Sequence, residues 1–356
     1  MRTEDIARWR LRTLRLSGEP LATADEIVGW LGAVQAQDYG PSKWSVGQRS
    51  LGLTDLDLER AMAEGSILRT HLLRPTWHFV QPADIRWLLA LTRARVHSLS
   101  AHGRRREGVD GRLLSRAHTA LADALAGGRH LTRDELGSSL AQVGIDARGS
   151  RLAHIVMHAE LEGLLCSGAP RGKQQTYALL DERVPPTAAV TRDEALVELT
   201  RRYFTSHGPA SARDLQWWSS LTLADVKRGI ALSDSLLRRQ VIDRVTYWVS
   251  SAAMPESQPC RRLHLLHMFD EYLVGYSETR GVMDVAGRGG SQFSTINVRS
   301  GVIILDGQLA GTWRRTLTRD RLTVEPTPST AIDPALLEAE ADRLSAFLGL
   351  PATLRV

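Results

Sequence analysis

Three stretches of this chain repeat one order of local patterns, in which helices are followed by two short strand-like segments around a turn. In the first block the helical and then the strand patterns lie near residues 3–16, 24–34, 55–64, 66–72 and 76–80. Leu73-Arg74-Pro75 separates the two strand patterns. A repeated supersecondary unit of this kind predicts tandem copies of one small fold rather than a single large core.

The second and third blocks follow the same plan. The second has patterns near 111–126, 132–142, 149–163, 164–166 and 176–179, and the third near 191–206, 211–218, 222–231, 240–242 and 246–249. Thr132 and Glu135 form a capping-box pattern at one helix start, and Pro185-Pro186 marks the boundary between the two blocks. Three helices plus a β-ribbon is the winged-helix plan, a helix-turn-helix variant that commonly binds DNA.

The last hundred residues have a different character. Short β-rich segments include 301–305 and 309–313, and Asp306-Gly307 between them is a strong hairpin signal. An amphipathic helix is expected near 333–348. We therefore predict an α+β protein with winged-helix domains at 1–104, 105–184 and 185–254, followed by a β-rich domain with a closing helix at 255–356.

The composition sets limits on the class of protein. With 356 residues, 43% of them hydrophobic and 24% charged, the chain is expected to be globular with two to four domains. No apolar run reaches the roughly 18 residues that span a bilayer, and Met1 to Asp5 do not read as a signal peptide. We expect a cytoplasmic protein without a membrane partner.

The charge balance allows a polyanionic partner. The net charge is +5, and only three of the 45 basic residues are lysines, namely Lys43, Lys173 and Lys227. A Schiff-base mechanism therefore has few candidate residues. The arginine cluster at 93, 95 and 104–106 fits either phosphate contacts or a solvated surface loop.

Gln35-Ala36-Gln37-Asp38 is the segment most suggestive of chemistry. It follows an apolar helical pattern that is expected to end near Val34. An extended backbone would place the amides of Gln35 and Gln37 on one side and turn Ala36 into the protein. Amides are neither acids nor bases near neutral pH, so two of them together would position a ligand or water rather than titrate.

Metal sites are weakly supported by the sequence. His154 and His158 share one helix face at i, i+4, but Ile155 stands where a zincin has its general base and no third ligand is evident. His264 to Glu271 contains ligand types in a β-leaning apolar stretch, and Cys166 and Cys260 lack metal-binding spacing. We expect no metal and no cofactor.

Several motifs, in order along nearly the whole chain, resemble the AlkZ-type winged-helix DNA glycosylases. They are Gln35-Ala36-Gln37-Asp38, Arg74-Pro75-Thr76-Trp77-His78, Gly208-Pro209-Ala210 with Trp217-Trp218, Phe269-Asp270-Glu271-Tyr272-Leu273-Val274-Gly275-Tyr276, and Leu305-Asp306-Gly307 with Gly311-Thr312-Trp313-Arg314-Arg315. Two positions depart from the pattern: Pro75 replaces the usual glycine, and Met268 stands where a proline is common. The resemblance implies a C-shaped assembly of the winged helices and the β-domain around a basic DNA channel.

The resemblance also implies an activity, which is hydrolysis of the N-glycosidic bond of N7-alkylated purines by a monofunctional enzyme. Gln35 and Gln37 match the two-glutamine version of the family's catalytic signature and would hold the attacking water. Asp38 would support them or act as base, and a plain role as a loop or helix-terminus acceptor is equally open. We expect DNA contacts from residues near the motif, on the first ribbon and in the last domain: Trp44, Arg69, Arg74, Thr76, His78, Arg280, Arg288, Arg299 and Arg314.

The expected partner is double-stranded DNA with alkylated bases, bound by a monomer. The sequence leaves open whether the adduct is a methyl group, a bulky antibiotic or an interstrand crosslink, in DNA repair or in self-resistance. It also leaves open whether the base is flipped. The competing interpretations are a non-catalytic winged-helix DNA-binding protein or transcription regulator, and a scaffold that uses winged helices for protein contacts.

Overall fold

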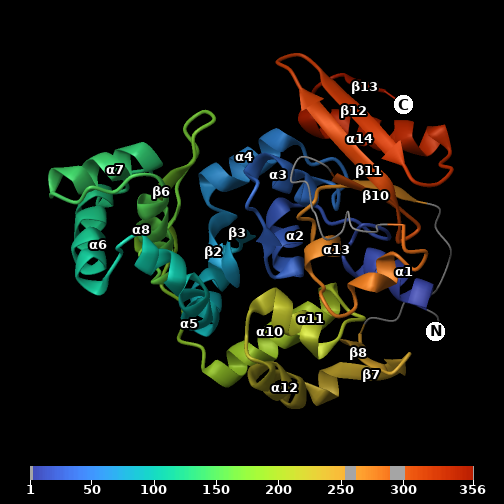
Figure 1. The fold of residues 1–356 in the computed structure, drawn as a ribbon, viewed down its shortest axis with the longest axis horizontal. Helices are drawn as coiled ribbons and strands as arrows, with labels where there is room; N and C mark the ends of the chain where they lie inside the picture. The colour runs from blue at the N-terminus through green and yellow to red at the C-terminus, as the bar shows by residue number, and fades with distance from the viewer. Residues whose placement is uncertain (1–2, 253–261, 289–300, 356) are drawn as a thin grey trace. The chain divides into compact units, whose positions relative to one another are not determined.

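A computed structural model of the chain describes residues 3–252, 262–288 and 301–355 (Figure 1). The chain forms two compact units. The first comprises Met1–Leu58, Leu196–Trp218 and Thr222–Val356, and the second comprises Glu59–Ala195 with Ser219–Leu221. The first unit thus collects segments from both ends of the chain.

The N-terminal part of the chain is helical. Its elements are α1 (Thr3–Thr13), α2 (Ala24–Leu31), β1 (Val34–Gln35), α3 (Tyr39–Gly47) and α4 (Asp55–Glu64). Thr23 and Glu26 form a capping box at the start of α2, in which each side chain accepts from the other residue's backbone N–H. Helix α2 ends three residues before the predicted Val34 because Gly32 takes a positive φ of 80°, which stops the helix.

The second unit begins within α4, at Glu59, and continues through an antiparallel hairpin and further helices. Its elements are β2 (Leu68–Leu72), β3 (Arg74–Val80), α5 (Pro82–Arg106), α6 (Gly111–Leu125), β4 (Leu131–Thr132), α7 (Arg133–Gln142), α8 (Gly149–Leu161), β5 (Leu165–Ser167), β6 (Thr176–Leu179) and α9 (Leu180–Arg183). Strands β4, β6 and β5 form one antiparallel sheet in that order. Apolar residues of α6, α7, α8 and this sheet share a buried cluster, which includes Leu121, Leu136, Ile155 and Tyr177.

The later part of the chain repeats helices before a ribbon. Its elements are α10 (Arg192–Ser206), α11 (Ala212–Ser219), α12 (Leu223–Leu232), the 3₁₀ helix η1 (Asp234–Leu236), β7 (Leu237–Ile242) and β8 (Val245–Ser250). Strands β7 and β8 pair antiparallel, and Ala210 makes a bridge to Trp248 of β8. This order of elements is the one that the sequence predicts for the third block.

The C-terminal part is built on a five-stranded sheet in the order β13-β12-β11-β10-β9. Its elements are β9 (Leu263–Leu266), α13 (Glu271–Val274), η2 (Arg280–Met283), β10 (Gly301–Leu305), β11 (Gln308–Leu317), β12 (Leu322–Pro328), α14 (Pro334–Leu348) and β13 (Ala352–Leu354). Helix α14 lies against this sheet, in the red part of Figure 1. Asp306 and Gly307 both have positive φ, as a two-residue hairpin turn requires, which confirms the predicted hairpin.

The mixture of helices and sheets confirms the predicted α+β class. The division into four domains stays a prediction, and the boundary between the compact units at Leu58 and Glu59 lies inside the first predicted domain. Among the described residues, no helix is both long enough and apolar enough to cross a membrane.

Buried ion pairs tie distant segments of the first unit together. Arg49, just after α3, donates two 2.8 Å hydrogen bonds to the two carboxylate oxygens of Asp270, and both side chains are fully buried. Gln48 and the Tyr272 amide also donate to this carboxylate. Burial alone would raise the pKa of Asp270, but the Arg49 charge and the hydrogen bonds from Arg49 and the Tyr272 backbone lower it below its ordinary value.

Asp270→Asn tests how much the Arg49–Asp270 ion pair contributes to the stability of the fold. The substitution leaves the buried Arg49 charge without a counter-ion, so we expect the free energy of unfolding to fall by about 3–5 kcal/mol. Asp342→Asn, at an exposed position on α14, serves as the matched control and should change stability little. Equal urea midpoints for the two variants would contradict the assignment.

The lowered pKa of Asp270 also fixes the sign of a pH dependence. The stabilisation is complete above the ordinary carboxyl pKa of 3.8 and is lost as pH falls through the lower pKa of the folded state. We expect the stability difference between wild type and Asp270→Asn to be constant near neutral pH and to shrink in acid. Urea titrations across this range measure it, and a difference that grows in acid would contradict the ion pair.

Candidate active site

The Gln35-Ala36-Gln37-Asp38 segment connects α2 to α3. Gln35 is in the extended backbone of β1, and Ala36 is fully buried, as the sequence predicts. The two glutamines differ in environment, because Gln35 is 6% exposed whereas Gln37 is exposed. Gln37 is therefore the glutamine that is more accessible to a reactant.

The buried carboxylate of Glu271 holds the backbone of this segment. Its Oε1 accepts a 2.8 Å hydrogen bond from the backbone N–H of Gln35, and its Oε2 accepts one of the same length from the indole of Trp218. His207 Nε2 lies 3.3 Å from Oε2. Burial lowers the pKa of His207 even though the Glu271 carboxylate raises it. The Trp218 indole and His207 hold the Glu271 carboxylate in place, and the carboxylate in turn fixes the backbone at Gln35.

Asp38 occupies the N-cap position of α3, but it does not cap the helix with its side chain. Its backbone carbonyl instead accepts from the amide and the hydroxyl of Ser42, at 2.9 and 2.7 Å. The carboxylate Oδ2 lies 3.7 Å from Nε2 of His267, whose side chain is buried. The Phe269 backbone N–H donates to His267 Nδ1 at 3.4 Å, and no described residue lies within hydrogen-bond distance of Nε2.

Arg315 lies near enough to the Asp38 carboxylate to be affected by its charge, whereas Lys43 is paired with Asp55. Burial lowers the pKa of Arg315 on β11, while the charges of Asp38 and Asp55 raise it. Lys43 pairs with Asp55 at 2.7 Å and lies 5.1 Å from the centre of the Tyr39 ring. The site therefore places one partly exposed carboxylate among positive and polar groups, next to an exposed amide.

Such an arrangement can orient a water molecule and stabilise positive charge on a reactant. An amide oxygen accepts from a water, and the neighbouring carboxylate adds negative potential without having to be a strong base. Among the described residues, the ligand types of 264–271 form no group of three suited to a metal. Asp270 and Glu271 are instead engaged with Arg49 and Gln35.

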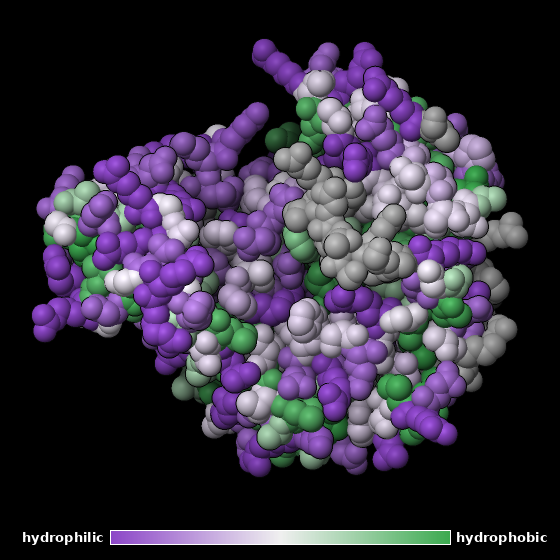
Figure 2. Space-filling model, in the orientation of Figure 1, coloured by the Kyte–Doolittle hydropathy of each residue, from purple (hydrophilic) through white to green (hydrophobic). Residues whose placement is uncertain are grey.

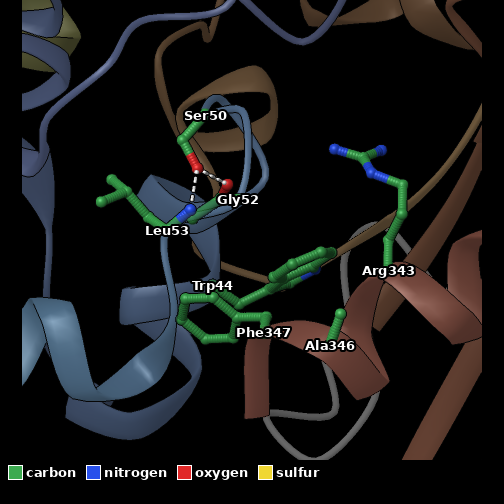
Figure 3. A pocket seen from close by; sticks show the side chains of 8 residues that line it. Trp44, Ser50, Gly52, Leu53, Arg343, Ala346 and Phe347 are labelled. Carbon is green, nitrogen blue, oxygen red and sulfur yellow. Dashed lines mark hydrogen bonds between the residues drawn. The ribbon is translucent and has the colours of Figure 1, made fainter. Parts of the chain in front are cut away.

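Trp44 does not fit the expectation that it contacts DNA. Its indole is 2% exposed and donates to the Leu265 carbonyl of β9 at 2.9 Å. The ring packs against Phe347 of α14, with the centroids 5.2 Å apart, and the Arg343 guanidinium is 5.9 Å from it. Trp44, Phe347 and Arg343 line a small pocket between α3 and α14, shown in Figure 3, to which residues 35–38 do not contribute. Trp44 is a packing residue.

The arginines expected to bind DNA in the C-terminal part differ in accessibility. Arg288 and Arg314 are exposed, whereas Arg280 is half-buried and donates to the Tyr276 carbonyl. Arg299 lies outside the described residues. Hydrophilic residues dominate the face drawn in Figure 2, with apolar residues scattered among them.

The hairpin β2–β3 belongs to the second unit and is described within it. Arg69 lies over the Trp77 ring at 4.4 Å, and Arg69 and Arg74 are each 8% exposed. His78 is fully buried, so its ring does not fit the expected surface contact; burial and the Arg74 charge lower its pKa. Thr76 is half-buried.

In the sequence, Glu271 and Arg315 stand out only as parts of longer motifs, and His267 only as a possible metal ligand. One signal for them was available, since charged residues interrupt an otherwise apolar stretch at 263–276. The pairing of each with 35–38 depends on tertiary contacts across more than 200 residues.

Comparison with known proteins identifies the family. The family described as "DNA glycosylase AlkZ-like" matches residues 28–347. The chain is 26% identical over 363 residues to an interstrand DNA cross-link repair glycosylase of Streptomyces sahachiroi, covering 97% of this chain and 96% of that protein. It is also similar to the solved structure of the DNA glycosylase AlkZ from the same organism, with a TM-score of 0.81, 24% identity and all of both chains covered. The resemblance seen in the sequence motifs is confirmed, and this chain belongs to the AlkZ-like DNA glycosylase family.

Proposed function

We propose that this DNA glycosylase hydrolyses the N-glycosidic bond of N7-alkylated purines in double-stranded DNA. The observation that carries the proposal is the 35–38 segment: Glu271 fixes its backbone, Gln37 is exposed, and Asp38 faces His267. The name of the Streptomyces sahachiroi relative, an interstrand DNA cross-link repair glycosylase, supports interstrand crosslinks as substrates.

The leaving group explains why amides suffice. An N7-alkylated guanine already carries a positive charge, so it departs without a strong acid to protonate it. What remains is a cation-like sugar and a water that must approach its opposite face. Amide oxygens accept from this water, and preorganised dipoles stabilise the developing positive charge, which together supply several kcal/mol of barrier reduction.

The three residues differ in role. Gln37 contacts the attacking water directly, and Gln35 completes its hydrogen bonding from a backbone position fixed by Glu271. Asp38 orients the water and adds negative potential, and its carboxylate lies 3.7 Å from the buried imidazole of His267. Exposed Arg288 and Arg314 contact the DNA phosphates. Tandem winged helices around a basic channel would bring the adduct to this segment.

Single-turnover release of 7-methylguanine from DNA tests the glutamines. We expect Gln35→Ala and Gln37→Ala each to lower the rate by roughly 100-fold, because each removes an acceptor aimed at the water. Gln142→Ala, at an exposed helix end, is the matched control and should leave the rate unchanged. Wild-type rates in both test variants would overturn the catalytic assignment, and loss of activity in Asp38→Asn alone would move the base to Asp38.

Glu271→Gln tests the positioning of the segment. An amide keeps the size of the side chain but replaces one acceptor oxygen with an NH2 donor, so the Gln35 backbone N–H or the Trp218 indole loses its acceptor. We expect the single-turnover rate to fall on the order of 10- to 100-fold while DNA affinity changes little. An equal loss in rate and in affinity would instead indicate general unfolding, which circular dichroism would reveal.

A panel of damaged DNA substrates tests which class of adduct the enzyme releases. Release rates from DNA carrying 7-methylguanine, a bulky N7 adduct or an interstrand crosslink rank the three classes directly. We expect the bulky and crosslinked adducts to be released at least as fast as 7-methylguanine. Release of 7-methylguanine alone would restrict the proposal to small adducts.

A further inference from the structure

Three histidines and a glutamate meet in the second unit, outside the proposed active site. His97 is on α5, His118 on α6 and His158 on α8, and Glu162 is the residue that follows α8. Nε2 of His97 lies 2.7 Å from Oε1 of Glu162, and the ring centres of His97 and His158 are 4.6 Å apart. One ligand atom from each of His97, His158 and Glu162 lies within 4.8 Å of the other two.

The protonation states of these four side chains favour the binding of a metal cation. Burial and the neighbouring histidines lower the pKa of His158 to about 4. The pKa values of His97 and His118 are also lowered, mainly by burial. Burial would raise the pKa of Glu162, but His97 and Arg93 outweigh it and the pKa is lowered. At neutral pH the cluster therefore holds uncharged imidazoles beside one carboxylate, the forms that bind metal ions.

We propose that His97, His158 and Glu162 bind one divalent transition-metal ion of the Zn²⁺ type. Two imidazoles and a carboxylate are a common ligand set for such an ion and leave a position for water. His118 Nε2 lies 3.2 Å from His158 Nδ1 and accepts its proton, which presents the other nitrogen of His158 to the ion. None of these residues takes part in the proposed glycosylase chemistry.

Metal binding requires the ligands to move, because their atoms lie up to 4.8 Å apart while one pair, His97 and Glu162, is closer than an ion allows. Ligand atoms at about 2.0–2.1 Å around a tetrahedral ion are roughly 3.3 Å apart, so His97 and Glu162 must separate by about half an ångström. The Glu162 side chain is 37% exposed and can make this movement. Arg104 opposes binding, because its Nη1 lies 3.2 Å from His97 Nδ1, and His97 must carry its proton there when Nε2 binds metal. Nη1 keeps its bonds to the His97 carbonyl and to Ser100.

The cluster explains why a sequence motif of His154 and His158 lacked a third ligand. The metal-binding partners of His158 come from α5, about 60 residues earlier, and from the end of its own helix. His154 is not a member of the group. A bound ion would fasten α5 to the C-terminal end of α8 and stabilise the second unit.

The test uses the full chain, freed of metal by a chelator and dialysed, then titrated with Zn²⁺ and with Co²⁺. We expect one Zn²⁺ per chain, a rise in melting temperature on the order of 5 °C at 100 times the dissociation constant, and the visible absorption of Co²⁺ bound by nitrogen and oxygen. His97→Gln, His158→Gln and Glu162→Gln should each weaken binding at least 10-fold.

Two further variants make the result specific. His154→Gln, one turn before His158 on the same helix, should bind Zn²⁺ as wild type does. Arg104→Ala removes the competing donor and a positive charge, so we expect it to tighten binding by roughly 3- to 10-fold. The proposal is overturned if the ligand variants bind as tightly as wild type, or if His154→Gln loses binding equally. Melting curves without metal confirm that each variant folds.

Discussion

The fully buried carboxylate of Glu271 is the constraint on which the candidate active site depends. A buried charge is tolerated only when donors surround it, and here the donors are the Gln35 amide, the Trp218 indole and, at 3.3 Å, His207. Desolvation therefore penalises any movement of these three groups away from the carboxylate. The chain at Gln35 has one favourable position, and the residues that follow it begin from a fixed point.

Asp270, the residue before Glu271, is also a buried carboxylate held by donors from a distant segment of the first unit. Asp270 binds Arg49 through both oxygens, and Asp214 accepts from the Thr279 amide while Arg10 donates to the Thr279 carbonyl. Each of these buried groups belongs to a segment far from its partner in sequence. Removing one member leaves another buried and unpaired, so these segments are stable only together.

Local sequence patterns predicted the elements better than the site. Capping at Thr132, the Asp306-Gly307 turn and the helices of the second block follow from interactions within a few residues, so the sequence contains their causes. The end of α2 was predicted three residues late because apolar spacing outweighed Gly32. Trp44 was assigned to DNA because an aromatic beside a polar motif has no local sign of burial, and its neighbours, Leu265 and Phe347, come from the other end of the chain. The roles of Glu271 and His267 toward residues 35–38 could not be found for the same reason.

The packing of α3 against α14 has a consequence for how the enzyme is made. Helix α3 starts directly after Asp38, and its far end is held by Phe347 on Trp44 and by Arg343, which donates to the Gln48 carbonyl at 2.9 Å. Residues 35–38 leave the ribosome early, but Arg343 and Phe347, which hold the far end of α3, are synthesised more than 290 positions later. A nascent chain therefore carries the motif long before it can form the site, and DNA glycosylase activity has to wait until α14 has been synthesised.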